Sequence, residues 1–528
     1  MADSNSTPLL SQPHSTDSEP PLHEHHPSLS STIEHCIGNF NLSQFLQVLL
    51  VSFAWAFDAQ QTFISIFTDA EPPWHCTHLA DGESCNSAAT SGSTMCNLPK
   101  SSWAWDHPKH TFIISEWSLE CSSSFINGLP ASSFLMGCLL GGFVMATLAD
   151  SSLGRKNMLF GSCLLMGFSS FLAMFSPNVW IYSALKFLCG FVRATIGTSS
   201  LVLTTELVGK RRRGQVGVIG FFCFTLGFLS LPAIAYTNRD SSWRNLYMWI
   251  SLPTILYSFL VHFFVRESPR WLLLQGKKEE AVETLKSITS VNQSSLNLVI
   301  SSLSSYKEEN WNVDLYSALK ILMQKKWSSR RLLAIMAMGI GIGLIYYGMP
   351  LGLGNLSFNL YLSVTFNALA ELPSSILTLL LIDKLNRRSA LLIFTFLSGI
   401  CSVLSIMERK PWTKMQIWFE LVSFFSGCTA FDIYLIYTTE LFPTCVRNSA
   451  ISMARQAVVF GGTFGPILVA AGRGHKFLSY GVFGLLMGFS GVFGILLPET
   501  RGRSLSDTLN EEENIEKKVV EGIGDAVA

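Results

Sequence analysis

Twelve apolar stretches, each about 20 residues long, constrain this chain more than any other feature of its sequence. A helix of roughly 20 apolar residues is long enough to cross the ~30 Å hydrocarbon core of a bilayer, so each stretch is a candidate membrane span. The candidate spans fall at residues 43–66, 127–149, 157–176, 179–201, 215–236 and 244–265, and then at 331–351, 359–382, 388–407, 413–437, 449–470 and 477–497.

The composition supports a membrane protein. Hydrophobic residues make up 48% of the chain and charged residues only 14%, whereas soluble domains contain about 25% charged residues. A soluble enzyme of this length would need more surface charge. Lys and Arg together equal Asp and Glu in number, so the charge gives no reason to expect nucleic acid as a partner.

The stretches form two groups of six, which predicts an all-α membrane protein with twelve transmembrane helices in two six-helix halves. The expected parts are a disordered cytosolic tail (1–42), an N-terminal half (43–265), a cytosolic middle loop (266–330), a C-terminal half (331–497) and a cytosolic tail (498–528). With the N-terminus inside, 25 of the 37 Lys and Arg residues fall in cytosolic segments and nine in outside segments. Since Lys and Arg concentrate in cytosolic loops, both termini are expected in the cytosol.

The first outside loop, residues 68–126, contains Cys76, Cys85, Cys96 and Cys121. Four cysteines in an exoplasmic loop indicate two disulfides, with three possible pairings. The nearby histidines do not have the spacing of a zinc site, and no metal site is expected.

Charged motifs recur in the two halves at offsets of 232 to 234 residues, always after equivalent spans. The repeated positions pair Asp150, Gly154, Arg155 and Lys156 with Asp383, Asn386, Arg387 and Arg388, then Glu206 with Glu440, and Glu267 with Glu499. Three matches in register indicate two homologous halves in the same orientation. A carboxylate at such a helix end can accept backbone N–H groups of a neighbouring helix or pair with Arg, and these contacts can break as the halves rock. The alternative is that the motifs are ordinary positively charged loops.

The motifs resemble those of a known family. Gly142 through Asp150 to Gly154-Arg155-Lys156 resembles the loop motif of the major facilitator superfamily, and residues 266–272, which include Glu267 and Arg270, resemble the motif that follows its span 6. The long Cys-bearing loop and residues 359–373 and 440–447, which end at Arg447, set the chain apart from sugar porters. Residues 40–505 are similar to plant organic cation/carnitine transporters. Two departures are an extra residue before Gly154 and Asn386 in place of Gly.

The resemblance implies a major facilitator fold and secondary transport of organic cations or carnitine by alternating access, with substrate bound between the halves. It implies no enzymatic activity, no cofactor and no nucleotide. The loop charges near the helix ends, including Arg501 after span 12, are expected to act in gating. A porter of another solute, such as a sugar or an organic anion, and a transporter-like receptor are the alternatives.

An ionisable residue within a span is costly and usually functional. The candidates are Asp58, Glu371, Glu420 and Asp432. The resemblance matches Glu371 to a span-8 glutamate and Tyr346 to a tyrosine that lines the substrate cavity of the cation members. A tyrosine face with a carboxylate suits a quaternary ammonium group, which binds through cation–π and Coulomb attraction. Glu420 lies nearer the outer end, where we expect it to be solvated.

Val459 occupies the span-11 position at which the cation members carry Asp. We hypothesise that the cation-binding charge has moved to Asp432 in span 10. Alternatively, Asp432 forms an ion pair with Arg193 or Arg455. Asp58 is either a substrate or proton site or an ion-pair partner, and either arginine would suit the carboxylate of carnitine.

The coupling ion and the membrane stay open at this point. Proton antiport is plausible, because one carboxylate can hold a proton and a cation in turn, but sodium coupling and facilitated diffusion fit as well. Leu9 and Leu10 after Pro8 resemble a dileucine sorting signal, which slightly favours an internal membrane such as the vacuole over the plasma membrane.

Overall fold

The computed structural model describes residues 40–77, 96, 98–149, 153–209, 212–288, 315–356, 358–381, 384–407, 415–443, 446–501 and 511–513. Most of the N-terminal tail, most of the middle loop and most of the C-terminal tail therefore lie outside the described residues. So do three residues singled out in the sequence, Cys85, Asp150 and Asp383.

Helices occupy all twelve predicted ranges, with ends that agree to within about five residues. The N-terminal half contains α2 (Leu42–Ser52), α3 (Ala54–Phe63), α4 (Ser65–Thr68), α7 (Ser124–Ala149), α8 (Arg155–Ala173), α9 (Val179–Arg193), α10 (Ile196–Glu206), α11 (Arg213–Thr237) and α12 (Trp243–Phe264). The C-terminal half contains α17 (Lys326–Gly352), α18 (Leu360–Leu381), α19 (Arg387–Leu404), α20 (Gln416–Leu441), α21 (Arg447–Ala471) and α22 (Tyr480–Val492).

Nine helical segments in the described part of the chain are long and apolar enough to cross a membrane. The helices α8, α18 and α22 occupy the three remaining predicted ranges. The count of twelve membrane spans stays a prediction. The outer surface suits a bilayer, since large apolar side chains such as Phe263 (73% exposed), Leu256 (65%) and Phe489 (64%) point away from the protein.

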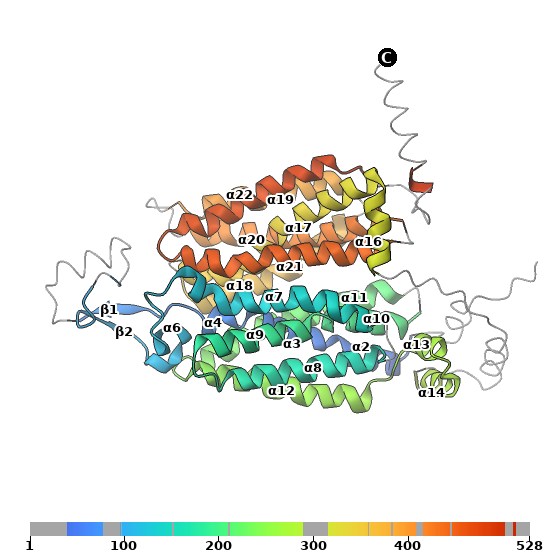
Figure 1. Cartoon of the computed structure of the whole chain (residues 1–528), viewed down its shortest axis with the longest axis horizontal. Helices are drawn as coiled ribbons and strands as arrows, with labels where there is room; N and C mark the ends of the chain where they lie inside the picture. Colours follow the sequence, from blue (N-terminus) through green and yellow to red (C-terminus); the bar gives the residue numbers. More distant parts are fainter. Residues whose placement is uncertain are drawn as a thin grey trace, which may run out of the picture.

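Two bundles lie side by side (Figure 1). One contains α2, α3, α8, α9, α10 and α12, and the other contains α17, α19, α20, α21 and α22. The helices α7, α11 and α18 run between them, with α7 packed on α21 and α11 packed on α18. These two pairs of helices join the halves, so side chains on them and on their neighbours can reach both halves.

Short elements cover the two ends of the bundles (Figure 1). At one end β1 (Trp74–Cys76) pairs antiparallel with β2 (Trp103–Trp105), beside η2 (Lys109–Thr111) and α6 (Ile113–Glu116). The all-α expectation missed this hairpin, because a three-residue strand carries too little periodicity to be recognised. At the opposite end lie α13 (Pro269–Leu274), α14 (Lys278–Ile288) and α16 (Leu315–Gln324).

The cysteines of the outer loop are oxidised where they are described. Cys96 and Cys121 form a disulfide, and Cys76 is disulfide-bonded as well. The loop is also fixed to the helices, because Glu116 accepts hydrogen bonds from Arg244 Nη1 (2.5 Å) and Trp243 Nε1 (2.6 Å) of α12. This end of the N-terminal half is therefore firmly held.

Candidate functional site

The first repeated loop brings Glu267, just after α12, to the N-terminus of α8. Its carboxylate accepts hydrogen bonds from the backbone N–H groups of Arg155 (3.1 Å) and Lys156 (3.1 Å). Gly154 precedes the helix with φ +83°, and a Cβ atom there would lie 2.3 Å from Glu267 Oε2. Glycine is needed for both reasons. Burial raises the pKa of Glu267 above its ordinary value, although the backbone N–H groups oppose the shift.

The second repeated loop reproduces this geometry in the C-terminal half. Glu499 accepts hydrogen bonds from the backbone N–H groups of Arg387 (2.8 Å) and Arg388 (3.2 Å). The Arg387 guanidinium also pairs with Glu440 at 3.3 Å, and Thr500 Oγ1 donates to Glu440 at 2.6 Å. Asn386 has φ −65°, an ordinary value for any residue, so the second loop does not require Gly.

The other residues expected to act in gating lie near helix ends or on the helices that these loops join. Gly142 on α7 faces α21, since a Cβ atom there would lie 1.8 Å from the side-chain nitrogen of Gln456. Glu206 ends α10, and Arg447 begins α21, where its Nε donates to the Phe442 carbonyl at 3.2 Å. Arg270 lies in α13, and Arg501 donates a backbone hydrogen bond to Glu499 at 3.2 Å.

Two carboxylates lie together with a tyrosine in the C-terminal half. The Tyr346 hydroxyl of α17 donates to Glu371 of α18 at 2.8 Å. One helical turn further along α18, Ser375 donates to Asp432 of α20 at 3.1 Å. We call Tyr346, Glu371, Ser375 and Asp432 the acidic cluster. In the described part of the chain no cation pairs with either carboxylate, so Asp432 is not bound to Arg193 or Arg455.

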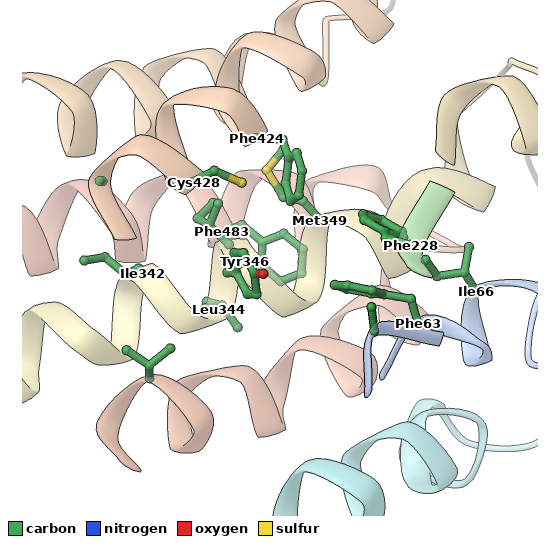
Figure 2. Close-up of a cluster of buried hydrophobic side chains, with 14 of the residues drawn as sticks. Phe63, Ile66, Phe228, Ile342, Leu344, Tyr346, Met349, Phe424, Cys428 and Phe483 are labelled. Carbon is green, nitrogen blue, oxygen red and sulfur yellow. The ribbon is translucent and has the colours of Figure 1, made fainter. Parts of the chain in front are cut away.

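Aromatic rings surround Tyr346. The ring of Phe431 stacks on Tyr346 with centroids 4.9 Å apart, and Phe424 lies at 6.4 Å on the same helix α20. From the N-terminal half, Phe63 lies 6.5 Å away and stacks on Phe228 at 4.1 Å. Figure 2 shows Phe424 above Tyr346 and the pair Phe63 and Phe228 to its right. The acidic cluster therefore lies at the boundary between the halves.

Asp58 and Arg193 form a buried ion pair within the N-terminal half. The Arg193 Nε donates to one carboxylate oxygen, and Nη2 donates to the other at 2.6 Å. Asp58 is 2% exposed. The structure therefore gives Asp58 the ion-pair partner that the sequence left open.

Arg455 of α21 lies close enough to this ion pair, and to Tyr346 and Tyr347, to interact with them electrostatically. Its guanidinium makes no hydrogen bond or ion pair with any other described residue. Val459, one turn further along α21, packs against the apolar core of the N-terminal half. Arg455 is thus a charge at the boundary of the halves that the described residues leave uncompensated.

Contacts between the halves lie at the end of the bundles that carries β1 and β2, the end expected to face outward. Arg473, just after α21, lies 3.6 Å from Glu71 and donates to the Asp69 carbonyl at 2.9 Å, both just after α4. Phe67 of α4 stacks on Tyr361 of α18 at 5.6 Å. Burial raises the pKa of Glu71 despite Arg473, and burial raises the pKa of Asp69 despite Lys186.

Sequence reasoning missed several of these residues. Arg473, Glu71 and Phe431 belong to no repeated motif, and only the folded chain brings them together. Glu420 was wrongly expected to be solvated. It is 0% exposed and accepts a hydrogen bond from Asn367 at 3.1 Å, because α18 packs against α20 there. Lys186, within α9, is also buried, with its Nζ 4.9 Å from the centroid of the Phe134 ring.

The paired halves, the repeated helix-end carboxylates and the charged residues between the halves define a membrane transporter of the major facilitator type. Residues 85–510 match the family described as "Sugar (and other) transporter". The fold also resembles a solved inward-open conformation of the xylose transporter XylE from E. coli, with a TM-score of 0.61 over 87% of this chain and 98% of that chain, at 16% identity.

Similar sequences show to which branch of this family the chain belongs. The chain is 58% identical to organic cation/carnitine transporter 3 of Arabidopsis thaliana, over 97% of this chain and 98% of that protein. It is 54% identical to organic cation/carnitine transporter 2 of the same plant, over 95% and 97%. The chain therefore belongs to the organic cation/carnitine transporter family within the sugar (and other) transporters, and these are transporters, not enzymes.

Proposed function

We propose that this chain moves organic cations or carnitine across a membrane by alternating access. The observation that carries the proposal is the acidic cluster, where two carboxylates without a paired cation lie against stacked aromatic rings at the boundary of the halves. A quaternary ammonium group has no N–H donors, so it is held by Coulomb attraction and by the faces of such rings. The names of the plant relatives agree with this class of substrate.

The charges at the boundary also suit a zwitterion. Asp58 and Arg193 neutralise each other, so Glu371, Asp432 and Arg455 remain. With both carboxylates ionised, the balance is one negative charge, which favours a cation. Arg455 then offers a partner for the carboxylate of carnitine while the ammonium group binds at the acidic cluster.

Alternating access is supported by contacts at opposite ends of the bundles. The outer end is closed by the Arg473–Glu71 ion pair and the Phe67–Tyr361 stack, which both join the halves. At the other end, Glu267 and Glu499 each cap a helix of their own half. We propose that the described state opens toward the cytosol and that rocking of the halves breaks the outer contacts.

Orientation, coupling and location belong to the proposal as well. The distribution of Lys and Arg supports cytosolic termini. Glu371 and Asp432 can each hold a proton when the substrate is absent, which supports proton antiport. Leu9 and Leu10 support the vacuolar membrane over the plasma membrane.

The test is uptake of radiolabelled tetraethylammonium and carnitine into proteoliposomes, with and without an imposed pH gradient. We expect saturable uptake of at least one compound and accumulation driven by the gradient. Absence of uptake of both compounds, in vesicles whose protein is shown to be folded, would reject the substrate class. Uptake without a response to the gradient would reject proton coupling alone.

An organic anion is the second candidate substrate, and Arg455 is the observation that favours it. If Glu371 and Asp432 are both protonated, the charge left at the boundary is positive. Uptake of a radiolabelled dicarboxylate that exceeds uptake of tetraethylammonium in the same vesicles would favour this alternative.

A further inference from the structure

Basic residues gather where α16 meets α17, at the end of the bundles opposite β1 and β2 (Figure 1). Five of the twelve residues from Lys320 to Arg331 are Lys or Arg, and none is Asp or Glu. Three of these basic residues, Lys320, Lys326 and Arg330, are exposed. In the part of the chain that the structure describes, no carboxylate pairs with these three side chains. The proposed transport site uses none of them.

The other two basic residues show that this region accepts anionic groups. Lys325 Nζ lies 2.6 Å from the carboxylate of Glu513. Arg331 Nη1 lies 2.7 Å from the carboxylate of Glu512. Both glutamates belong to the short described segment 511–513 of the C-terminal tail. The five basic residues outnumber the three glutamates of that segment, so the region keeps a net positive charge.

The exposed basic residues of α17 continue a side of the helix that is apolar further along. Four exposed residues of α17 lie four, three and seven positions apart: Lys326, Arg330, Leu333 and Ile340. These spacings place them on one face of the helix. Leu333 is 56% exposed and Ile340 is 38% exposed, so this face suits contact with hydrocarbon. Along the helix axis, Arg330 and Lys326 lie about 5 and 10 Å beyond Leu333, where lipid headgroups would begin.

The neighbouring helix α16 also exposes basic and apolar groups together. Lys320 and Met323, which is 52% exposed, lie three residues apart and therefore on one face of α16. Leu322 is 0% exposed, and α16 packs on α17. A helix with this division of side chains suits the interface between membrane and water. Anionic lipids of the cytosolic leaflet attract clusters of about four to eight basic residues beside a membrane helix.

We propose that α16 and the start of α17 bind an anionic phospholipid of the cytosolic leaflet, with its phosphate held by Lys320, Lys326 and Arg330 and its acyl chains along Leu333. A soluble phosphate or an acidic peptide would use the charges but not the adjoining apolar face. The lipid anchors the first helix of the C-terminal half, which also carries the acidic-cluster tyrosine. The inference uses the proposed orientation, in which this end faces the cytosol, and no part of the proposed substrate site.

The test measures binding of a fluorescent phosphatidic acid with short acyl chains to the purified full chain in detergent, by fluorescence anisotropy. A diacylglycerol with the same chains and fluorophore but no phosphate is the matched probe. For the wild type we expect saturable binding of phosphatidic acid and at least tenfold weaker binding of diacylglycerol. The double variant Lys326→Gln and Arg330→Gln should bind phosphatidic acid at least tenfold more weakly, because each basic residue beside an anionic lipid contributes about fivefold.

Two further double variants separate a local loss of charge from other effects. Lys326→Arg with Arg330→Lys keeps both charges and should bind phosphatidic acid like the wild type. Lys277→Gln with Lys278→Gln removes two exposed charges at the same end of the molecule, before and within α14, and should also keep binding.

Three outcomes would overturn the proposal. The first is equal affinity of the Lys326→Gln and Arg330→Gln double variant and the wild type. The second is equal binding of the two probes, which would show that the phosphate is not recognised. The third is displacement of phosphatidic acid by inorganic phosphate at a similar concentration, which would make the ligand a soluble anion. None of these measurements uses an organic cation or depends on orientation, so they stand apart from the proposed function.

Discussion

The carboxylates inside the helix bundles differ in what neutralises them. Asp58 has a paired arginine, Arg193, and therefore contributes no net charge. Glu371 accepts a hydrogen bond from the Tyr346 hydroxyl and Asp432 accepts one from the Ser375 hydroxyl, and no cation in the described part of the chain pairs with either carboxylate. A hydroxyl group does not cancel a charge, so these two carboxylates keep the ability to attract a cation. This difference supports the proposal that the substrate cation binds at the acidic cluster.

Asp432→Asn should abolish uptake of organic cations, because it removes the charge while keeping the hydrogen bond from Ser375. Radiolabelled uptake, compared at equal surface expression, measures the effect. Ser375→Ala is the control, since it removes the hydrogen bond and leaves the charge, and we expect it to retain transport. Unchanged uptake by Asp432→Asn would show that the cation binds elsewhere.

Arg455→Gln should separate carnitine from tetraethylammonium. The loss of a charge-assisted contact to a carboxylate costs about 1.5–3 kcal/mol, which corresponds to roughly a tenfold to hundredfold weaker binding of carnitine. Tetraethylammonium has no carboxylate, so its KM should stay the same or fall. The KM values of the two compounds for the same variant measure the difference. An equal rise in both values would contradict a role for Arg455 in recognising the carboxylate.

Part of this site could be predicted from single residues. Tyr346 and Glu371 were proposed together, and the structure joins them by a hydrogen bond of 2.8 Å. The partner of Asp58 could not be predicted, because Arg193 is 135 residues away and no sequence pattern favours it over Arg455. The burial of Glu420 depends on packing against α18, which no local pattern in the sequence reveals.

At the scale of elements, the two repeated glutamates do the same structural work. Each glutamate follows the last membrane helix of its half. Each accepts hydrogen bonds from backbone N–H groups at the start of the helix in the third predicted range of that half, which is α8 or α19. The N-terminus of a helix presents unpaired N–H groups and a partial positive charge, so a carboxylate is a suitable cap. The same geometry in both halves explains why the sequence motif repeats with an offset of 232 residues.

Gly154→Ala should destabilise the protein by about 1–3 kcal/mol, because φ +83° and ψ 160° form a conformation that essentially only glycine adopts. The new Cβ atom would also displace Glu267 from its cap. A lower Tm of the purified protein measures the effect. Gly161→Ala in the same helix is the control: it meets no atom within 4 Å and should be neutral or stabilising. Equal Tm values for the two variants would contradict this account.

Long helices were the most predictable elements, since about 20 apolar residues leave few alternatives. Short elements were not predictable in this way. The strands β1 and β2 have three residues each, which is too few for a periodic pattern to be recognised in the sequence.

At the scale of the whole molecule, a few charged groups join the two halves at the end of the bundles that carries β1 and β2. Arg473 contacts both Glu71 and the Asp69 backbone. The Asp69 carboxyl in turn accepts a hydrogen bond from Tyr182 at 3.1 Å and lies near Lys186. Rotation of one half away from the other would separate Arg473 from Glu71 and from the Asp69 carbonyl.

Acid on the outer side should favour the closed state. Burial raises the pKa values of Glu71 and Asp69 in the closed state, and both values should return toward normal when the outer end opens. A group with a higher pKa in the closed state binds its proton more tightly there, so closure takes up protons as the pH falls toward those values.

Distances between spin labels at Phe125→Cys and Gly474→Cys can measure this closure, since both positions are exposed and lie at the outer ends of different halves. We expect the short-distance population to grow between pH 8 and pH 5. The double variant Asp69→Asn and Glu71→Gln should lose this dependence on pH. A population of open molecules that grows with acid would contradict the prediction.

The unequal charge of the halves also has an evolutionary and practical consequence. The repeat indicates that the halves descend from one ancestral six-helix unit, yet one now holds a self-neutralised pair, Asp58 with Arg193, while the other holds the bare carboxylates Glu371 and Asp432. The two copies therefore differ in the buried charges that they hold. Libraries intended to change the cargo should therefore randomise α17, α18, α20 and α21 and leave the first copy untouched.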